Sequence, residues 1–388
     1  MPIFILLFFI LLILYAVVIE RYRKGWNQLP EYIPDGDSPS VFISVIISAR
    51  NEENNINDLL NSLEEQVYSK ELFEVIVIDD HSTDNTWAEL QQYIPAELQT
   101  VFIQLNLDPE SSKGIIAYKK KAIETGINHA RGRLIVTSDA DCLFNPNWLL
   151  TIASFYELTK AKCIAAPVVM SRSKSFLSLF QSLDFMTLQG ITGAAIHKKI
   201  HTMCNGANFI YEREIFHEVG GFRGIDNIPS GDDMLLMEKI YEKFPDDVRY
   251  LKSSNAIVTT GPMKDWRSFI NQRIRWSGKT DHYSNKKMFH ILLLVYILNV
   301  CFLILTIAIF FKSSWLFLLL LFLLAKTIIE FPFVNTVAKF FGRQFQMKFF
   351  PLMQPIHILY TIIAGWFGKF GSYEWKERRV QVKKTSND

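Results

Sequence analysis

The chain has 388 residues, of which 49% are apolar, so it can form one large soluble core and a substantial membrane part. Its net charge is only +2, and no basic stripe of the kind that neutralises nucleic-acid phosphates is present. The four cysteines are widely spaced and form neither a CxxC pair nor a Cys/His zinc pattern; they are Cys142, Cys163, Cys204 and Cys301. Nucleic-acid binding and structural zinc are therefore disfavoured, and we expect a reducing compartment.

An uncharged apolar run opens the chain and predicts a transmembrane anchor within residues 1–24. The run covers residues 2–19, which is just long enough for a spanning helix. It lacks the basic start and the small-residue cleavage site of a signal peptide. Arg21, Arg23 and Lys24 follow directly, so the positive-inside rule places the next segment in the cytoplasm. We expect a multi-pass protein of the inner (plasma) membrane with a cytoplasmic catalytic domain.

Two apolar stretches, residues 289–311 and 315–335, predict a helical hairpin through the membrane. Lys326 and Glu330 lie near one end of the second stretch. Their side chains either extend to the membrane interface or line a polar path through the bilayer. These stretches begin a C-terminal membrane region, residues 289–370.

A further apolar segment, residues 349–368, is a weaker candidate span. Pro351, Pro355 and His357 interrupt it. If this segment crossed the bilayer as well, the basic tail at residues 371–388 would lie outside the cytoplasm. A re-entrant or interfacial segment is therefore an alternative to a fourth span.

Residues 41–285 alternate apolar strands with helical periods, which predicts a soluble α/β domain. Nearly continuous runs rich in Val and Ile are typical of buried parallel strands; they cover residues 44–48, 75–78, 101–105 and 134–137. The i, i+3, i+4, i+7 spacing of a crossover helix appears between the first two runs, at Ile56, Leu59, Leu60 and Leu63. Ligands of such sheets bind at the carboxyl ends of the strands. A dehydrogenase is disfavoured, because residues 48–53 do not read GxGxxG.

Acidic side chains follow the second and fourth predicted strands. Asp79 and Asp80 are adjacent carboxylates, which repel each other unless a cation or hydrogen-bond donors lie nearby. Asp139 and Asp141 are separated by one residue, so in an extended segment both can face the same side. Such oxygen ligands suit Mg²⁺ or Mn²⁺, which would offset the charge of a departing diphosphate. Asp84, by contrast, looks like a helix cap.

Asp232 and Asp233 precede an apolar helix start at Met234. A carboxylate at this place either caps the helix or acts as the general base that takes a proton from an attacking hydroxyl.

Gln272, Arg275 and Trp276 lie at i, i+3 and i+4 and so share one helical face, with Arg273 turned aside. This face offers an amide, a forked cation suited to a diphosphate and an aromatic plate for a sugar. A basic amphipathic helix at the lipid headgroups is the alternative interpretation.

In this order, the motifs resemble those of membrane-embedded family-2 glycosyltransferases, which are related to hyaluronan and cellulose synthases and to ceramide glucosyltransferase. The resemblance covers residues 41–285, and the flanking helices match as well. It rests on SARNE at 48–52, VIDDHSTD at 77–84, SDAD at 138–141, GDD at 231–233 and QRIRW at 272–276. The resemblance implies a GT-A fold with N-terminal and C-terminal transmembrane helices, a UDP-sugar donor and inversion at the anomeric carbon.

The resemblance also implies roles for the matched residues. The donor-binding residues on this basis are Ala49, Glu52, Asp79, Asp80, Lys119, Asp139, Gly206 and Arg275. Lys119, Lys120 and Lys121 fall where relatives carry a lysine near the diphosphate, although Tyr118 replaces their glycine. His81 likewise replaces a glycine that follows the paired aspartates in most relatives.

The same resemblance implies that Asp141 is the main metal ligand and that Asp139 lies by the ribose and the metal. Asp233 would be the general base, supported by Asp232. The acceptor-binding residues are Gln272 and Trp276.

The expected activity is metal-dependent transfer of a hexose from a UDP-sugar to a membrane lipid or lipid-linked acceptor in envelope glycan or glycolipid synthesis. A processive polysaccharide synthase is the alternative, because the QxxRW helix occurs in relatives of both kinds. The small number of predicted spans favours single transfer over polymer export. A catalytically silent membrane partner that only binds nucleotide sugars is a more distant alternative.

Overall fold

The computed structural model describes residues 2–36, 38–105, 117–278, 286–375 and 378–381. By its contacts the chain divides into two compact units. The sheet unit comprises Pro30–Ser171 and Thr202–Gly261, and the helical unit comprises Met1–Leu29, Arg172–His201 and Pro262–Asp388. Each unit is built from segments that are far apart in the sequence.

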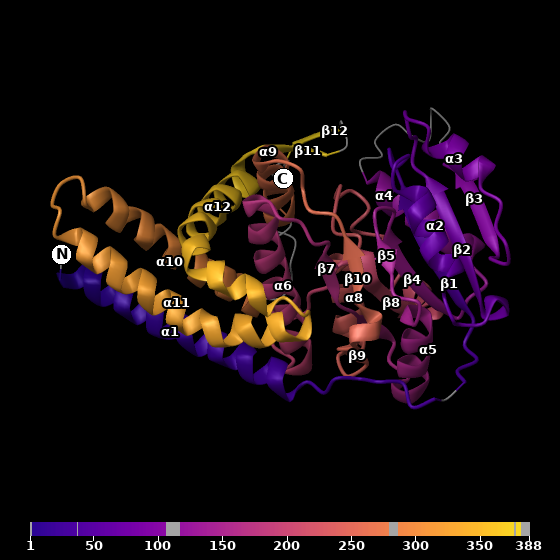
Figure 1. Ribbon diagram of the computed structural model, residues 1–388, viewed down its shortest axis with the longest axis horizontal. Helices are drawn as coiled ribbons and strands as arrows, with labels where there is room; N and C mark the ends of the chain where they lie inside the picture. Colours follow the sequence, from indigo (N-terminus) through magenta and orange to yellow (C-terminus); the bar gives the residue numbers. More distant parts are fainter. Residues whose placement is uncertain (1, 37, 106–116, 279–285, 376–377, 382–388) are drawn as a thin grey trace. The chain divides into compact units, whose positions relative to one another are not determined.

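A seven-stranded sheet forms the core of the sheet unit, in the order β3-β2-β1-β4-β8-β6-β9 (Figure 1). The strands are β1 (Ile43–Ala49), β2 (Phe73–Asp79), β3 (Thr100–Gln104), β4 (Leu134–Asp139), β6 (Cys163–Ala165), β8 (Phe209–Glu212) and β9 (Val248–Tyr250). β1 to β4 are parallel, whereas β8 runs antiparallel to β4 and β6. The four predicted strands are thus confirmed. β1, β2 and β4 are buried as predicted, whereas β3, at the edge of the sheet, is partly exposed.

The strand order reverses at β1, and this reversal decides where the helices go. The chain builds β1, β2 and β3 in one direction and then returns to place β4 on the other side of β1. Because parallel crossovers are right-handed, α2 (Ile56–Glu64) and α3 (Thr86–Gln92) cover one face of the sheet and α4 (Tyr118–His129) covers the other. The reversal between β1 and β4 is the place where open α/β sheets bind ligands.

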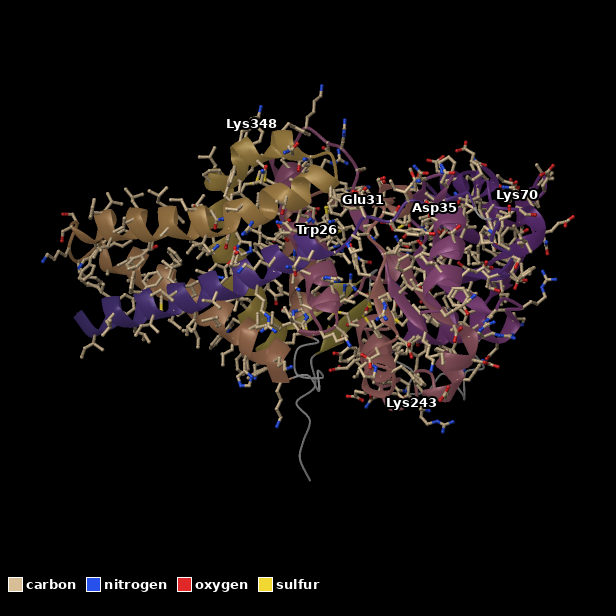
Figure 2. The ribbon with its side chains drawn as sticks, turned by 90° about the horizontal axis from the view of Figure 1, so that it is seen from below. Trp26, Glu31, Asp35, Lys70, Lys243 and Lys348 are labelled. Carbon is tan, nitrogen blue, oxygen red and sulfur yellow. The ribbon has the colours of Figure 1, made fainter. Side chains whose placement is uncertain are left out.

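Helix α2 has the predicted apolar stripe, since Ile56, Leu59, Leu60 and Leu63 are all buried. Its C-terminal end is held by Lys70, which Figure 2 labels. The Lys70 ammonium donates to the carbonyl oxygens of Glu64 at 2.5 Å and Gln66 at 2.7 Å. A cation at this end of a helix also offsets the helix dipole, so the crossover that leads into β2 is firmly held.

Shorter elements complete the sheet unit. A three-stranded sheet has the order β5 (Leu143–Phe144), β10 (Val258–Thr260) and β7 (Val168–Met170). The remaining helices are α5 (Trp148–Thr159), η1 (Lys70–Leu72), η2 (Gly206–Asn208), α7 (Arg213–Glu218), α8 (Met234–Lys243) and η3 (Ser254–Ala256). α8 follows the paired aspartates directly, as predicted for an apolar helix start.

The helical unit is dominated by long apolar helices. They are α1 (Pro2–Gln28), α6 (Phe176–His197), α10 (Lys286–Ala308), α11 (Trp315–Phe340) and α12 (Phe350–Phe370). The unit also contains the more polar α9 (Trp266–Ser277), η5 (Gln344–Phe349) before α12, and the antiparallel strands β11 (Ser372–Trp375) and β12 (Arg378–Gln381). α1 packs along α6 and α11 (Figure 1). Near the end of α1, the buried Trp26 (Figure 2) meets Phe340 edge-on, with ring centroids 5.4 Å apart.

Four helices in the described part of the chain are long and apolar enough to cross a membrane: Ile3–Gln28, Lys286–Ala308, Trp315–Phe340 and Gln344–Phe370. The fourth has the lowest mean hydropathy, 1.2 against 3.1 for the first. Pro351 lies in the first turn of α12, where the missing N–H has no helical partner, and Pro355 lies inside the helix. Length and composition therefore make this segment a candidate span despite its prolines.

A buried polar cluster links three of these helices. Lys326 donates to Glu330 at 2.6 Å and to Gln354 at 2.7 Å, and Tyr15 and Gln354 both donate to Glu330. Lys326 is 1% exposed and Glu330 is 7% exposed. The expectation that these two side chains reach out to the membrane interface is therefore wrong, because their charges are neutralised inside the bundle. The cluster joins α1, α11 and α12.

Replacing Glu330 alone should strongly destabilise the helical unit. A Glu330→Leu change leaves the Lys326 ammonium buried without its counter-charge, which costs about 3–5 kcal/mol. The double variant Lys326→Met, Glu330→Leu removes both charges and should recover most of that loss. Thermal unfolding of the purified protein in detergent measures both, and equal melting temperatures for the single and double variants would contradict the ion-pair interpretation.

Candidate active site

The sheet brings several of the predicted donor-binding residues to one edge; Arg275 instead lies on α9 in the helical unit. In the register of the parallel strands, Ala49 lies beside Asp79, and Ser48 lies beside Asp139. The carboxyl ends of β1, β2 and β4 therefore meet at the reversal of strand order. This is the position that the sequence predicts for the nucleotide-sugar site.

The turn after β2 is held by Arg50. Its Nη1 donates to the carbonyl oxygens of Asp80 at 2.8 Å and His81 at 2.7 Å, and the Asp80 N–H donates to the Ala49 carbonyl at 2.8 Å. His81 has φ of +54°, a left-handed conformation that glycine adopts without strain. His81 thus adopts the backbone conformation that the predicted glycine position would favour, and its Nδ1 lies 3.0 Å from the buried Asp80 carboxylate.

Asp79 is fully buried at the end of β2. Among the described residues, neither of its carboxylate oxygens has a hydrogen-bond partner. Burying a carboxylate without hydrogen bonds raises the free energy of the folded state, so any hydrogen-bond donor that reaches Asp79 would stabilise it. Because Asp79 is buried, a donor nucleotide can contact it only if its surroundings change. Glu52, on the neighbouring loop, is partly exposed and needs no such change.

Lys119 connects the two acidic motifs of the site. Its ammonium lies 2.6 Å from Asp139 and 3.4 Å from Asp232. Burial alone would lower the pKa of Lys119, but the carboxylates of Asp139, Asp232 and Asp233 raise it well above its usual value. Lys119 is therefore a permanent cation between the end of β4 and the start of α8, as a residue near a diphosphate needs to be.

Asp233 is both a helix cap and a member of the site. Its Oδ1 accepts from the N–H of Met234 at 2.7 Å, and its Oδ2 accepts from the N–H of Gly206 at 2.9 Å. A Cβ atom on Gly206 would lie 3.4 Å from Asp232 Oδ2 and 3.6 Å from Asp233 Oδ2. The capping interpretation is thus correct and compatible with the catalytic one, because two backbone donors fix the carboxylate beside the Gly206 segment.

The segment that contains Gly206 is itself rigidly supported. Ser138 at the end of β4 donates to the carbonyl oxygen of Ala207 at 2.8 Å. The buried Asn208 donates to the carbonyl oxygens of Pro167 and Ala256, and it accepts from Trp148 Nε1 at 3.1 Å. All polar atoms of the Asn208 side chain are therefore used to hold the loop, which leaves small residues facing the aspartates.

Asp139 and Asp141 occupy the strand end and the turn after it. Asp141 Oδ2 accepts from Thr260 Oγ1 at 3.0 Å. Within the described residues, no three His, Cys, Asp or Glu side chains converge on a point that could hold a metal. Mg²⁺ and Mn²⁺ are usually held by one or two carboxylates, with phosphates completing the shell, so this pair fits a metal that arrives with a sugar nucleotide.

From the sequence, Lys120 is only one of three adjacent lysines and has no role of its own. It is 2% exposed, and its ammonium donates to the carbonyl oxygens of Ile225 at 2.8 Å, Ile228 at 2.6 Å and Ser230 at 2.9 Å. All three ammonium hydrogens are thereby used. The contact fixes the loop that leads into Asp232, and nothing in the local run of three lysines distinguishes this one from its neighbours.

In the helical unit, α9 carries the QRIRW motif. Gln272, Arg275 and Trp276 are partly exposed, whereas Arg273 is buried. The Arg273 guanidinium lies 4.2 Å from the Trp276 ring centroid and donates to Gln272 Oε1 at 3.0 Å. It also lies 2.8 Å from Asp184 on α6, an ion pair by distance without hydrogen-bond alignment. The arginine that the helical spacing turns aside thus orients the motif residues.

Helix α9 is also joined closely to α12. Ser277 Oγ donates to the carbonyl oxygen of Ala364 at 2.5 Å, and Ile274 packs against Ala364. A Cβ atom on Gly368 would lie only 2.0 Å from Ser277 Oγ, so glycine is required for this approach. The motif helix is therefore built into the bundle of apolar helices.

Comparisons with curated proteins find related enzymes. The chain is 25% identical over 268 residues to the probable glycosyltransferase YdaM from Bacillus subtilis, covering 67% of this chain and 57% of that protein. It is 27% identical over 159 residues to a beta-monoglucosyldiacylglycerol synthase from a Nostoc species, covering 41% of this chain and 31% of that protein. The matched segments thus span less than two thirds of either relative.

A solved structure shows the same fold. The mannosyltransferase PcManGT from Pyrobaculum calidifontis, determined in complex with GDP-Man and Mn²⁺, is similar to 92% of this chain and 97% of its own, with a TM-score of 0.59 and 17% identity. This likeness supports the predicted mixed α/β, GT-A type of sheet.

Two family models match the chain: Glycosyl transferase family 2 over residues 44–220, and Glycosyl transferase family group 2 over residues 134–341. The second covers more than half of the chain, and the two together include all five motifs that carry the resemblance. The resemblance is therefore confirmed, and this chain belongs to glycosyltransferase family 2.

Proposed function

We propose that this glycosyltransferase moves a hexose from a UDP-sugar to a membrane lipid or lipid-linked acceptor, with inversion at the anomeric carbon. The observation that supports this most directly is the bridge formed by Lys119 between Asp139 and Asp232. It joins the candidate donor and metal carboxylates to the candidate catalytic pair at the reversal of strand order. Such a site combines the charges that a departing diphosphate and an attacking hydroxyl each require.

In the proposed mechanism, Asp233 takes the proton from the acceptor hydroxyl as it attacks. The N–H groups of Met234 and Gly206 keep its carboxylate in place, and Asp232 supports it. Lys119 and Arg275 stabilise negative charge on the leaving diphosphate. Asp139 and Asp141 would hold Mg²⁺ or Mn²⁺, which would supply further positive charge at the diphosphate; the similar mannosyltransferase was determined in complex with Mn²⁺.

Ala49, Glu52 and Asp80 are the residues that we propose for the uridine, with Gly206 beside the donor sugar. Ala49 ends β1, Asp80 directly follows β2 and Glu52 lies on the loop after β1, and these places support the assignment. Gln272 and Trp276, oriented by Arg273, are proposed to bind the acceptor.

A lipid acceptor is favoured by the apolar helices and by the glycolipid synthase among the relatives. The basic cluster Arg21, Arg23 and Lys24 after the first candidate span supports a plasma-membrane protein with its catalytic domain in the cytoplasm.

Screening UDP-sugars for UDP release in the presence of membrane lipid tests the activity. We expect release with one UDP-sugar, loss of release when EDTA removes the metal, and recovery with Mg²⁺ or Mn²⁺. Mass spectrometry of the product should show a lipid with one added hexose. A polymer would instead establish the processive alternative, and no release with any sugar nucleotide would contradict the proposed enzyme.

An Asp233→Asn variant tests the general base. The amide keeps the size of the side chain but cannot take a proton, so we expect kcat to fall about 10²- to 10⁴-fold. Donor affinity, measured by calorimetry with UDP, should change little. Near-normal transfer by this variant would sink the assignment of Asp233 as the base.

The variants Lys120→Met and Lys121→Met form a matched pair. Lys120→Met leaves three carbonyl oxygens without their buried donor, so we expect a loss of about 1–3 kcal/mol in stability and a marked fall in kcat. Lys121 is exposed, and its ammonium lies 3.0 Å from the Glu124 carboxylate, a surface ion pair. Lys121→Met should therefore change stability and kcat very little. Unfolding curves and transfer rates measure both; similar behaviour of the two variants would show that the Lys120 contact does not order the loop.

A further inference from the structure

A buried carboxylate on α6, Asp184, meets the QRIRW helix inside the helical unit. It is the single carboxylate in the sequence of α6, a mostly apolar helix. Asp184 is 8% exposed, and its Oδ2 lies 2.8 Å from Nη2 of Arg273, which is 4% exposed. Because a charge buried this deeply is unfavourable without a counter-charge, each of these two side chains depends on the other for its place.

Helix α12 holds the other oxygen of this carboxylate. The hydroxyl of Tyr360 donates to Asp184 Oδ1, and Nε2 of His357, one turn earlier on α12, lies 3.8 Å from the same atom. The Tyr360 ring packs edge-on against the Phe269 ring of α9, with centroids 5.3 Å apart. α12 therefore holds Oδ1 while Oδ2 faces α9, so the orientation of the carboxylate is determined from both sides.

Arg273 contacts both of the residues that we propose for the acceptor. Its Nη1 donates to Gln272 Oε1 at 3.0 Å. Its guanidinium carbon lies 4.2 Å from the centroid of the Trp276 ring and 4.7 Å from that of the Phe269 ring, at i+3 and i−4 on the same helix. Because aromatic faces attract a cation, the guanidinium and the Trp276 ring restrict each other.

The next residue of α6 contacts the same motif. The Phe185 ring lies 6.0 Å from the Trp276 ring, centroid to centroid, at an interplanar angle of 38°. Consecutive positions of α6 thus present a counter-charge to Arg273 and a ring to Trp276. An ion pair that only joined two helices could lie anywhere along them, whereas this one lies at the motif.

We propose that Asp184 is a positioning residue of the acceptor site, which holds Arg273 where its guanidinium orients Gln272 and Trp276. The inference rests on the proposed function, in which those two residues bind the acceptor. Removing the charge of Asp184 leaves the guanidinium buried without a counter-charge, so that it moves away from the Trp276 ring towards water. Acceptor binding weakens as a result, because small displacements of binding groups have large effects.

Fluorine NMR of the full-length protein in detergent, labelled with 5-fluorotryptophan, tests the positioning. The chain has eight tryptophans, and a Trp276→Phe variant assigns the signal of Trp276. In Asp184→Asn, whose amide oxygen still accepts from Tyr360, we expect this signal to move by more than its line width. Its difference between H₂O and D₂O, which reports exposure of the ring, should also change. The matched control Ser182→Ala removes a buried hydrogen bond of the same helix, 3.0 Å long to Gln346, and should leave the signal in place.

Transfer kinetics test the role in acceptor binding, with the lipid acceptor that the UDP-release screen identifies. We expect Asp184→Asn to raise the acceptor KM about 10- to 100-fold and Ser182→Ala to leave it within about twofold. Loss of folded enzyme lowers kcat without changing KM, so this split separates positioning from a purely structural role.

Three results would each overturn the proposal: an unmoved Trp276 signal in Asp184→Asn, equal changes in Asp184→Asn and Ser182→Ala, or an acceptor KM that stays normal while kcat falls. An unaltered protein that transfers no sugar would contradict the proposed function instead. The fluorine spectra need no sugar donor, so a moved Trp276 signal would still establish that Asp184 positions the motif.

Discussion

The mutual repulsion of carboxylates at the reversal of strand order is the constraint on which the sheet unit depends. β4 ends in Asp139, and the start of α8 brings Asp232 and Asp233 to the same place. Lys119 lies between these groups and offsets their charge, with Asp139 only 2.6 Å away. The backbone N–H groups of Gly206 and Met234 provide further stabilisation for Asp233. The Gly206 segment and the loop before Asp232 are both held in place next to these charges.

The helical unit also contains buried charges, and ion pairs neutralise them. Among the described residues, several of its charges are buried where water screens them poorly, and their contacts include residues on other helices. Lys326 and Glu330 form one such group, and Arg273 with Asp184 forms another. Because a buried charge is tolerable only with its partner in place, these pairs restrict how the helices can pack. Polar contacts thus determine the arrangement of a bundle whose surface is mostly apolar.

The sequence was sufficient to predict the four parallel strands and the carboxylates that follow two of them, because those features are local. Buried parallel strands leave continuous apolar runs, and the carboxylates that follow them lie at the strand ends by necessity. Asp139 and Asp79 were found in this way. The apolar helices were equally visible, since length and composition alone identify them.

Contacts between distant segments were not predictable. Lys120 lies in a run of three lysines, and only the fold shows that it holds a loop some hundred residues away. Helical spacing predicts that Arg273 lies away from the motif face. It does not predict the partner of Arg273, because Asp184 comes from another helix. Lys326 and Glu330 pair across one helical turn, but their burial depends on α1 and α12. In each case the decisive partner is remote in sequence.

The close approach of α9 to α12 has a mechanical consequence. Gly368 allows Ser277 and Ala364 to join the two helices, and α12 is itself a candidate span that contains Pro355. A bilayer that is thinner or thicker than the apolar length of α12 changes the tilt of that helix. If α12 spans the bilayer, its contact with α9 would transmit such a tilt, and the thickness of the surrounding membrane would then adjust the orientation of Gln272 and Trp276.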